Sequence, residues 1–273
     1  MSSSPRRWQI GTTVLIAVLA AVSSLLGLFR PGHYNDAQAL LARYFVQDAI
    51  MLAYAIPVLL VGLWFAVRGS LRGRFVWLGA LAFMTYMWVT YSLQLAFNEF
   101  FLGYVTLVGL SLFTLIGGLV DTDAAMVYDR MREPVSRPVF VGVLTLIAIG
   151  LGALWLSELV LATLTGTEPA AIQQFGHQAV ESYVIDLAVV VPALLITAAW
   201  LWLDRAWGYV FTGVLLVFSA VLAPNLTAIT AIDLQTGVEM STGMVAATVL
   251  PPALGILFAA AFLRETRLHP DTD

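Results

Sequence analysis

The stretch of sequence that decides the fold covers residues 49–67 and reads AIMLAYAIPVLLVGLWFAV. It contains no charged side chain, and its length is close to the ~20 residues that a helix needs to cross the ~30 Å hydrocarbon core of a bilayer. The turn that follows, RGSLRGR at residues 68–74, carries three arginines. An apolar run that ends in an arginine-rich turn is typical of a membrane-spanning helix that ends at the cytoplasmic face.

Seven further apolar runs of similar length occur along the chain, so the sequence predicts eight membrane-spanning helices. Each run must be helical because lipid offers no hydrogen-bond partners to the backbone, and none shows the alternating polarity of β-barrel strands. The first run is long for a signal peptide and no clear cleavage site follows it, which favours a retained helix. The predicted spans are Ile10–Phe29, Ala49–Val67, Val76–Ala96, Phe101–Val120, Val139–Leu164, Val184–Leu203, Tyr209–Ile232 and Met244–Leu263.

The overall composition also requires a membrane. Hydrophobic residues make up 60% of the 273 residues and charged residues 11%, against the ~25% charged residues of a typical soluble domain. So few charges cannot cover the exterior of a protein in water. We therefore expect a single all-α transmembrane domain over residues 1–273, with the lipid bilayer as its partner and a homo-oligomer or a membrane partner subunit left open. The net charge of −4 argues against nucleic-acid binding, because a protein that binds nucleic acid needs a basic surface.

The arginines give the orientation, because cytoplasmic loops of membrane proteins carry an excess of basic residues. With the N-terminus inside, the external segments hold only Arg30 and Arg43. The sequence thus predicts a multi-pass protein of the cell membrane with both termini in the cytoplasm. The predicted cytoplasmic arginines are Arg6, Arg7, Arg68, Arg72, Arg74, Arg130, Arg132, Arg137, Arg205, Arg264 and Arg267.

Several kinds of chemistry are excluded by residue types that are missing. The chain has no cysteine, which excludes disulfides, thiolate catalysis and cysteine-ligated metals. The histidines His33, His177 and His269 lie outside the apolar runs, so they cannot bind a haem inside the membrane. No Walker, His-Glu-x-x-His or Gly-x-Ser-x-Gly motif occurs. We expect no cofactor, no metal and no catalytic residue, and the sequence favours a protein that is not an enzyme.

The second and sixth predicted spans share a layout. One has Asp48, then Pro57, then a Leu-Leu pair and a tryptophan; the other has Asp186 and Pro192 followed in the same way. The aspartate–proline spacings differ, nine residues against six, and a chance similarity of two apolar helices is the alternative. A duplication would divide the chain into residues 1–125 and 135–273, two halves of four spans in the same orientation.

Ionisable side chains inside a bilayer are costly, so each is a candidate for a functional role. Glu158 is the only charge in the run Val139–Leu164, and Asp186 lies about one turn inside the sixth predicted span. For Glu158 the alternative is that the helix ends nearby and the carboxylate reaches the external headgroups. For Asp186 and Asp48 the alternative is that each lies near a helix N-terminus, where the helix dipole stabilises a negative charge without any ligand.

The predicted topology puts these carboxylates and other polar side chains at one external level, where they could form an acidic pocket. Clustered carboxylates near an imidazole can bind a cation or accept protons, while ordinary polar helix ends are the alternative. In the third predicted span, Tyr86, Thr90 and Gln94 form a polar stripe at a spacing of four residues. The predicted ligand- or proton-binding residues are Glu158, Asp186, Asp48, Glu99, Asn98, Gln94, Tyr91, His177 and Glu181.

Two parts of the chain resemble known sequences. The second span with the turn at residues 68–74 and the run up to Tyr91, and Asp186 through Pro192 to the segment DRAWGY at residues 204–209, are similar to stretches of uncharacterised prokaryotic multi-pass membrane proteins. The resemblance covers about half of the chain. It implies a helical bundle and brings no catalytic or binding residues with it.

The function hypothesis is a transporter of small solutes or ions, or another proton-coupled membrane protein, with an external acidic pocket. Prolines interrupt four of the predicted spans, as in the broken helices that line transporter sites. They are Pro57, Pro192, Pro224 and the pair Pro251 and Pro252. The competing hypothesis is a non-transporting membrane subunit, scaffold or assembly factor, in which the polar groups only hold helices together.

Overall fold

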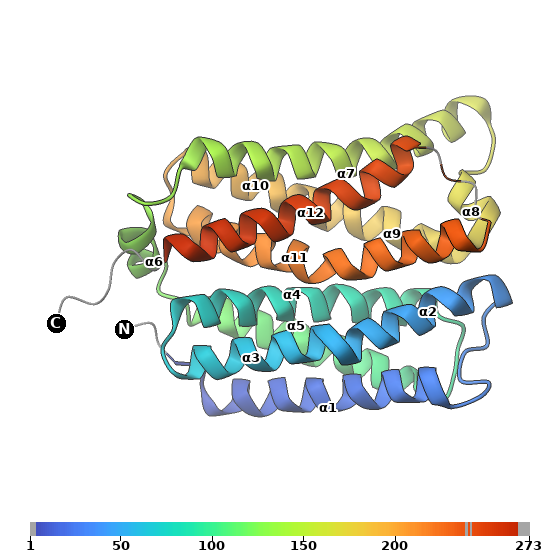
Figure 1. Ribbon diagram of the computed structural model, residues 1–273, viewed down its shortest axis with the longest axis horizontal. Coiled ribbons are helices and arrows are strands. Elements are labelled where there is room, and N and C mark those ends of the chain that lie inside the picture. The colour runs from blue at the N-terminus through green and yellow to red at the C-terminus, as the bar shows by residue number, and fades with distance from the viewer. Residues whose placement is uncertain (1–3, 238–239, 241, 267–273) are drawn as a thin grey trace.

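The computed structural model describes residues 4–237, 240 and 242–266, and the regular elements of this part of the chain are all helices. Eight of its segments are long and apolar enough to cross a membrane, which confirms the predicted all-α bundle of eight helices (Figure 1). Arg267 and His269 lie outside the described residues. The helices are α1 (Arg7–Phe29), α2 (Gln38–Ile50), η1 (Met51–Ala55), α3 (Ile56–Val67), α4 (Leu71–Gln94), α5 (Phe101–Val120), α6 (Ala124–Met131), α7 (Arg137–Thr165), α8 (Ala170–Phe175), η2 (His177–Ala179), α9 (Val180–Ile185), η3 (Asp186–Val190), α10 (Val191–Trp202), α11 (Ala206–Gln235) and α12 (Thr242–Glu265).

The second span is longer than the sequence predicts. It begins at Leu40 instead of Ala49 and continues through α2, η1 and α3 to Val67. The sequence places Gln47 and Asp48 before the span, but both side chains are buried in the bundle. A polar residue that packs inside the bundle does not have to end a helix, which is why the apolar run alone gives too short a span.

The eight spans form two groups of four that follow each other along the chain. The first half contains α1, α2–α3, α4 and α5, and the second contains α7, α9–α10, α11 and α12 (Figure 1). The packing order is the same in both: α3 contacts α4 and α4 contacts α5, as α10 contacts α11 and α11 contacts α12. The halves meet where α4 packs against α11.

Matching turns join the second and third spans of each half. Gly69 and Asp204 adopt the left-handed backbone conformation in these turns, with φ of 80° and 57°. The residue after each one donates its N–H to a carbonyl oxygen in the preceding helix, at 3.0 Å in the first turn and 2.9 Å in the second. Gly73 and Gly208 follow at the same distance along the chain, and at both the backbone of the preceding helix leaves no room for a Cβ atom. A duplication of four spans, as the sequence predicts, requires similar turns at equivalent positions of the two halves.

A π-helical segment precedes a proline in the middle of the second span of each half. In the first half η1 precedes Pro57, and in the second half η3 precedes Pro192. Because proline has no N–H, it cannot donate to the carbonyl four residues earlier, and a wider π turn is a common local adjustment that is often found at functional sites. Asp186 is the first residue of η3.

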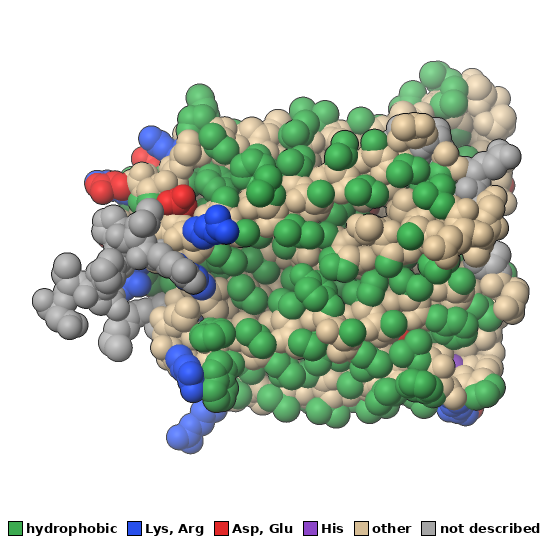
Figure 2. All heavy atoms as spheres, in the orientation of Figure 1, with side chains coloured by type: hydrophobic (Ala, Val, Ile, Leu, Met, Phe, Trp, Pro, Cys, Tyr) green, Lys and Arg blue, Asp and Glu red, His purple; other side chains and the backbone are tan. Residues whose placement is uncertain are grey.

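The two ends of the bundle differ in charge. Ser4 contacts Val67 at the end of α3, and Thr266 contacts Arg72 at the start of α4, so both ends of the described chain lie at one end of the bundle, which we call the termini end. Figure 2 shows charged side chains gathered at this end and hydrophobic side chains along the length of the visible face. The opposite end carries α8 and is called the α8 end (Figure 1).

Candidate functional site

A cavity of about 240 Å³ lies between the two halves, in the part of the bundle nearer the α8 end. Its walls come from α2 and α4 of the first half and from α7, α8, η2, α9, η3, α10, α11 and α12 of the second. This volume is far above the ~15 Å³ that one water molecule needs and slightly below the ~300 Å³ at which small-molecule pockets usually begin. The walls are mainly apolar with a few polar side chains, as ligand pockets usually are.

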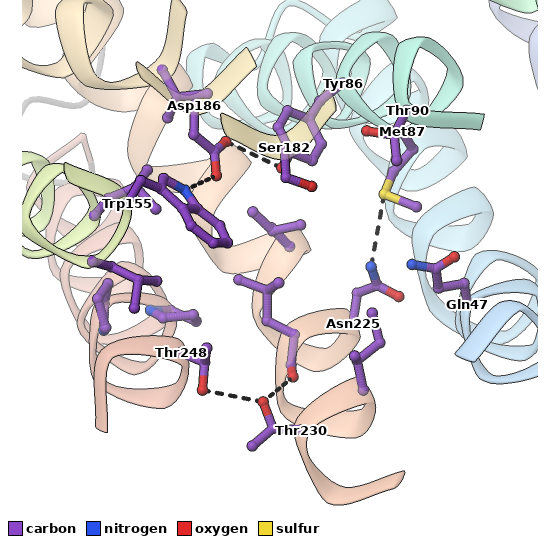
Figure 3. A pocket seen from close by; sticks show the side chains of 18 of the residues that line it. Gln47, Tyr86, Met87, Thr90, Trp155, Ser182, Asp186, Asn225, Thr230 and Thr248 are labelled. Carbon is purple, nitrogen blue, oxygen red and sulfur yellow. Dashed lines mark hydrogen bonds between the residues drawn. The ribbon is translucent and has the colours of Figure 1, made fainter. Parts of the chain in front are cut away.

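Asp186 is a buried carboxylate of the cavity wall, only 6% exposed. The indole N–H of Trp155 donates to one of its oxygens at 2.8 Å, and the Tyr86 hydroxyl donates to the other at 3.2 Å (Figure 3). Both donors are neutral. Within the described part of the chain no arginine or histidine forms an ion pair with this carboxylate. Asp186 therefore has hydrogen-bond donors but no countercharge.

Another wall of the cavity carries polar atoms without a hydrogen-bond partner among the described residues. They are the side-chain carbonyl oxygens of Gln47 and Asn225. Figure 3 shows Gln47, Thr90 and Asn225 near one another beside Met87, whose sulfur accepts a hydrogen bond from the Asn225 amide at 3.7 Å. Buried polar atoms are nearly always paired in folded proteins. Two unpaired acceptors at one cavity therefore indicate a place for water or a polar ligand.

An ion pair between the halves forms part of the cavity wall. The Arg43 guanidinium of α2 donates to both carboxylate oxygens of Asp233 of α11, each at 2.6 Å. The side chains are 17% and 7% exposed. The guanidinium carbon of Arg43 also lies 3.6 Å from the centre of the Phe175 ring of α8. The Arg43 side chain thus joins α2 to both α8 and α11 beside the cavity.

Prolines alter the backbone of α11 and α12 beside the cavity, although both helices continue through them. Pro224 has no N–H and leaves the carbonyl of Ala220 without its helical donor. The Tyr54 hydroxyl of η1 donates to this carbonyl at 3.3 Å, so the first half supplies a hydrogen bond that the second half lacks. Pro251 and Pro252 of α12 line the cavity themselves.

A second buried carboxylate, Asp48, lies in the first half and outside the cavity lining. The Tyr34 hydroxyl donates to it at 2.5 Å and the Tyr91 hydroxyl at 3.3 Å. Asp48 is 0% exposed. Gly27 of α1 packs so closely that a Cβ atom at this position would overlap the carboxylate. Asp48 is thus enclosed by its neighbours, whereas Asp186 borders an open space.

Further polar groups extend the surroundings of Asp48 toward the α8 end. The His33 imidazole and the Tyr104 hydroxyl are 3.1 Å apart, and the Asn98 amide donates to the same hydroxyl at 3.2 Å. Burial and the nearby Arg30 guanidinium lower the pKa of His33, which keeps its imidazole neutral at neutral pH. The Asp48 cluster consists of Asp48, Tyr34, Tyr91, His33, Tyr104 and Asn98.

The nine residues predicted as one binding site do not share one pocket. Asp186 and Gln94 line the cavity. Asp48, Tyr91 and Asn98 belong to the Asp48 cluster instead. The predicted residues are therefore divided between the cavity lining and the Asp48 cluster.

Glu158 has a local structural role in the described contacts. One of its carboxylate oxygens accepts a hydrogen bond from the backbone N–H of Ala171 at 2.7 Å and another from the Tyr183 hydroxyl at 2.8 Å. Glu158 therefore fastens α8 and α9 to α7, and it is not part of the cavity lining.

The three remaining predicted residues also lie at the α8 end. Glu181 is buried, and one carboxylate oxygen accepts a hydrogen bond from Ser182 while the other has no partner in the described part of the chain. Glu99 pairs with Arg30 at 2.8 Å on the exposed surface, and His177 is exposed. No group of three or more acidic or histidine side chains in the described chain is arranged to hold a metal ion.

The sequence patterns did not single out several residues that define the cavity. Arg43 and Asp233 are 190 positions apart, and nothing local indicates that they pair. Trp155 lies in an apolar run, where an aromatic residue is ordinary. Asn225 was detectable in principle, because an amide that follows a proline within a span is as unusual as the polar stripe that contains Thr90.

Comparison of the chain with protein-family models, with curated proteins and with solved structures finds no match. The resemblance to prokaryotic multi-pass membrane proteins gains no support from these comparisons. A helical bundle by itself is compatible with many functions, so the function has to be inferred from the site.

Proposed function

We propose that the protein is a membrane transporter that binds a small solute in the cavity between its two halves. One observation carries this proposal: the cavity combines a buried carboxylate without a countercharge and two unpartnered polar atoms. Such groups are costly at membrane depth, and they usually mark the path of a substrate or an ion. In a bundle that serves only as a support, well-packed apolar side chains would fill the same space at lower cost.

The arrangement of the helices supports transport further. Many transporters bind their substrates between two repeats, next to helices that are interrupted. Here the cavity lies between two similar halves, and η3, Pro224 and the pair Pro251 and Pro252 interrupt the regular backbone around it. We also propose that the halves arose by duplication, with residues 1–125 and 135–273 as the two copies.

We place the protein in the cell membrane with both termini in the cytoplasm and the α8 end outside. In the described part of the chain, Arg30 and Arg43 are the arginines at the α8 end, and the others lie near the termini end. An excess of arginine marks the cytoplasmic side. In this orientation the cavity, which lies nearer the α8 end, would receive its solute from outside the cell.

The competing proposal is a non-transporting membrane subunit, scaffold or assembly factor. The Asp48 cluster favours it, because there a buried carboxylate that lines neither described cavity joins helices through hydrogen bonds from tyrosines. The two proposals differ in one respect: a transporter must expose its cavity to water, in turn, on both sides of the membrane.

Cysteine labelling distinguishes them, and the absence of native cysteine makes every introduced thiol unique. We expect that Asn225→Cys, in the cavity wall, reacts with a charged, membrane-impermeant thiol reagent added to either side of sealed vesicles. Met84→Cys, on α4 but fully buried in the core, should stay unreactive. Thr236→Cys at the α8 end and Glu133→Cys at the termini end, both exposed, should each react from one side only, and from opposite sides.

The labelling pattern decides between the functions. Reaction of the cavity cysteine from both sides supports a transporter, and reaction from one side only indicates a receptor or a subunit with a binding site. Absence of any reaction, with Thr236→Cys reacting normally, would contradict the proposed function. Reaction of Thr236→Cys and Glu133→Cys from the same side would contradict the proposed topology.

A further inference from the structure

We propose that the cavity accepts a small organic cation, an ammonium group on an apolar body, which takes the place of a proton on Asp186. This inference rests on one part of the proposed function, the binding of a small solute in a cavity that opens to water. It concerns the class of substrate and is independent of whether the solute crosses the membrane.

The charges around the cavity are the first argument. One basic and two acidic side chains line it: Arg43, Asp186 and Asp233. Arg43 and Asp233 neutralise each other through two hydrogen bonds of 2.6 Å. Asp186 remains without a countercharge, and Glu181, which interacts with it electrostatically, adds a second buried carboxylate. With Asp186 ionised, the site therefore carries a net negative charge and needs one positive charge, which either a proton or a bound cation supplies.

The unpartnered polar atoms are the second argument. The side-chain carbonyl oxygens of Gln47 and Asn225 can only accept hydrogen bonds, so they call for a donor in the ligand. Both side chains are at least nine-tenths buried, and both lie at the cavity (Figure 3). The N–H groups of an ammonium are donors, whereas a carboxylate or phosphate ligand would place further acceptors against these oxygens.

The apolar part of the lining is the third argument. It favours an organic cation over a bare inorganic ion. Aromatic rings of Trp155, Tyr86 and Phe218 border the cavity, and such rings attract cations through their faces. Aliphatic side chains such as Leu151 and Leu222 cover much of the remainder. A metal ion would need several oxygen ligands close together. An aliphatic or aromatic ammonium matches both the acidic and the apolar walls.

The exchange with a proton follows from the burial of Asp186. An isolated carboxylate away from water is strongly disfavoured, and it becomes neutral by taking up a proton. When the ammonium binds, the O–H bond of the carboxylic acid breaks and the proton leaves to water. An ion pair then forms between the ammonium and the carboxylate, and no covalent bond to the ligand is made. One positive charge enters the site as another leaves it.

Other titratable groups near Asp186 decide which side chains can release a proton when a cation binds. The lining residues that α7, α10 and α12 contribute carry no titratable group. The groups that face Asp186 or the cavity from the other elements are Tyr86 on α4, Glu181 on α9, Arg43 and Tyr44 on α2, and Asp233 on α11. Of these, Arg43 and Asp233 are held in their pair, so Asp186 and Glu181 are the carboxylates that can release a proton when a cation arrives.

Calorimetric titration of the purified full-length protein in detergent tests the proposal with three probes that share one apolar body. They are phenethylammonium, neutral 2-phenylethanol and anionic phenylacetate. We expect phenethylammonium to bind about tenfold tighter or more than the other two, a difference of ~1.4 kcal/mol. Titrations in buffers of different ionisation enthalpy should show a release of about one proton per bound cation.

Two variants assign the effect to Asp186. Asp186→Asn should weaken phenethylammonium binding about tenfold or more and remove the proton release. Glu168→Gln, which changes an exposed carboxylate at the same end of the bundle, should leave both unchanged. If Asp186→Asn does not fold, the comparison of the three probes on the unmodified protein still decides the question.

The proposal is overturned if phenethylammonium does not bind, if 2-phenylethanol or phenylacetate binds as tightly, or if Asp186→Asn releases the proton as before. These outcomes are separate from the labelling experiment. Binding of the cation together with one-sided labelling at position 225 would leave this inference intact and refute transport. Labelling at position 225 from both sides, together with tighter binding of phenylacetate, would support transport and refute this inference.

Discussion

Arg43→Ala is expected to lower the free energy of unfolding by about 3–5 kcal/mol, the cost of breaking a buried ion pair from one side. Asp233 is 7% exposed, so without the guanidinium its charge stays buried and unpaired. The loss should be visible as a lower unfolding temperature of the detergent-solubilised protein, followed by the fluorescence of its tryptophans. Because the pair joins α2 to α11, the two halves should also separate more easily at the α8 end.

A matched control is available at the same end of the bundle. Arg30 also pairs with a carboxylate, that of Glu99, but the side chains are 49% and 77% exposed, and such surface pairs contribute little. Arg30→Ala should therefore leave the unfolding temperature almost unchanged. The double variant Arg43→Leu and Asp233→Leu should recover most of the loss, since no charge is left alone. Equal effects of Arg43→Ala and Arg30→Ala would refute the account of this contact.

Asp48→Leu is expected to destabilise the protein by roughly 2–6 kcal/mol, because the Tyr34 and Tyr91 hydroxyls would each lose a buried acceptor at about 1–3 kcal/mol per group. Asp48→Asn should cost much less. The amide keeps one acceptor oxygen, and its N–H₂ group can donate to the second hydroxyl. Thermal unfolding of the two variants side by side measures the difference.

The comparison of these two variants also shows whether the charge of Asp48 matters. If the Asp48 cluster only joins helices, shape and hydrogen bonding are sufficient, and asparagine should replace aspartate with little loss. Asparagine as damaging as leucine would mean that the negative charge itself is needed, and would return Asp48 to the list of candidate proton-binding residues. The close packing of its carboxylate against Gly27 favours the first outcome.

The two buried aspartates show why similar sequence contexts lead to different surroundings. Both precede a proline in the same span, but Asp48 lies nine residues before its proline and ahead of η1, whereas Asp186 lies six residues before its proline and is the first residue of η3. A shift of three residues moves a side chain to another part of a helix face. Asp48 therefore points toward α1, and Asp186 borders the space between α4, α7 and α11.

The spans could be predicted from the sequence because the energetic requirement is local. A run such as residues 101–120 is apolar throughout, and lipid forces it to be helical whatever its neighbours do. The start of the second span could not be predicted in this way. Arg43, Gln47 and Asp48 look like residues of a loop, and only contacts with other helices make their burial tolerable.

The site was predictable only where one residue stands out against an apolar background. Asp186 and Gln94 did so, and both line the cavity. The Arg43–Asp233 pair and the approach of Gln47 to Asn225 depend on how the two halves pack. No pattern within either helix records that packing, and the comparisons with known proteins offered no template for it.

The reaction rate of Asn225→Cys with a charged thiol reagent, measured in membranes with and without phenethylammonium, tests most directly whether the cavity is a water-accessible solute site. We predict that the cysteine reacts and that saturating phenethylammonium slows the reaction severalfold, while the exposed Thr236→Cys reacts at an unchanged rate. A cysteine at position 225 that does not react, or that reacts equally fast with and without the cation, would contradict the account.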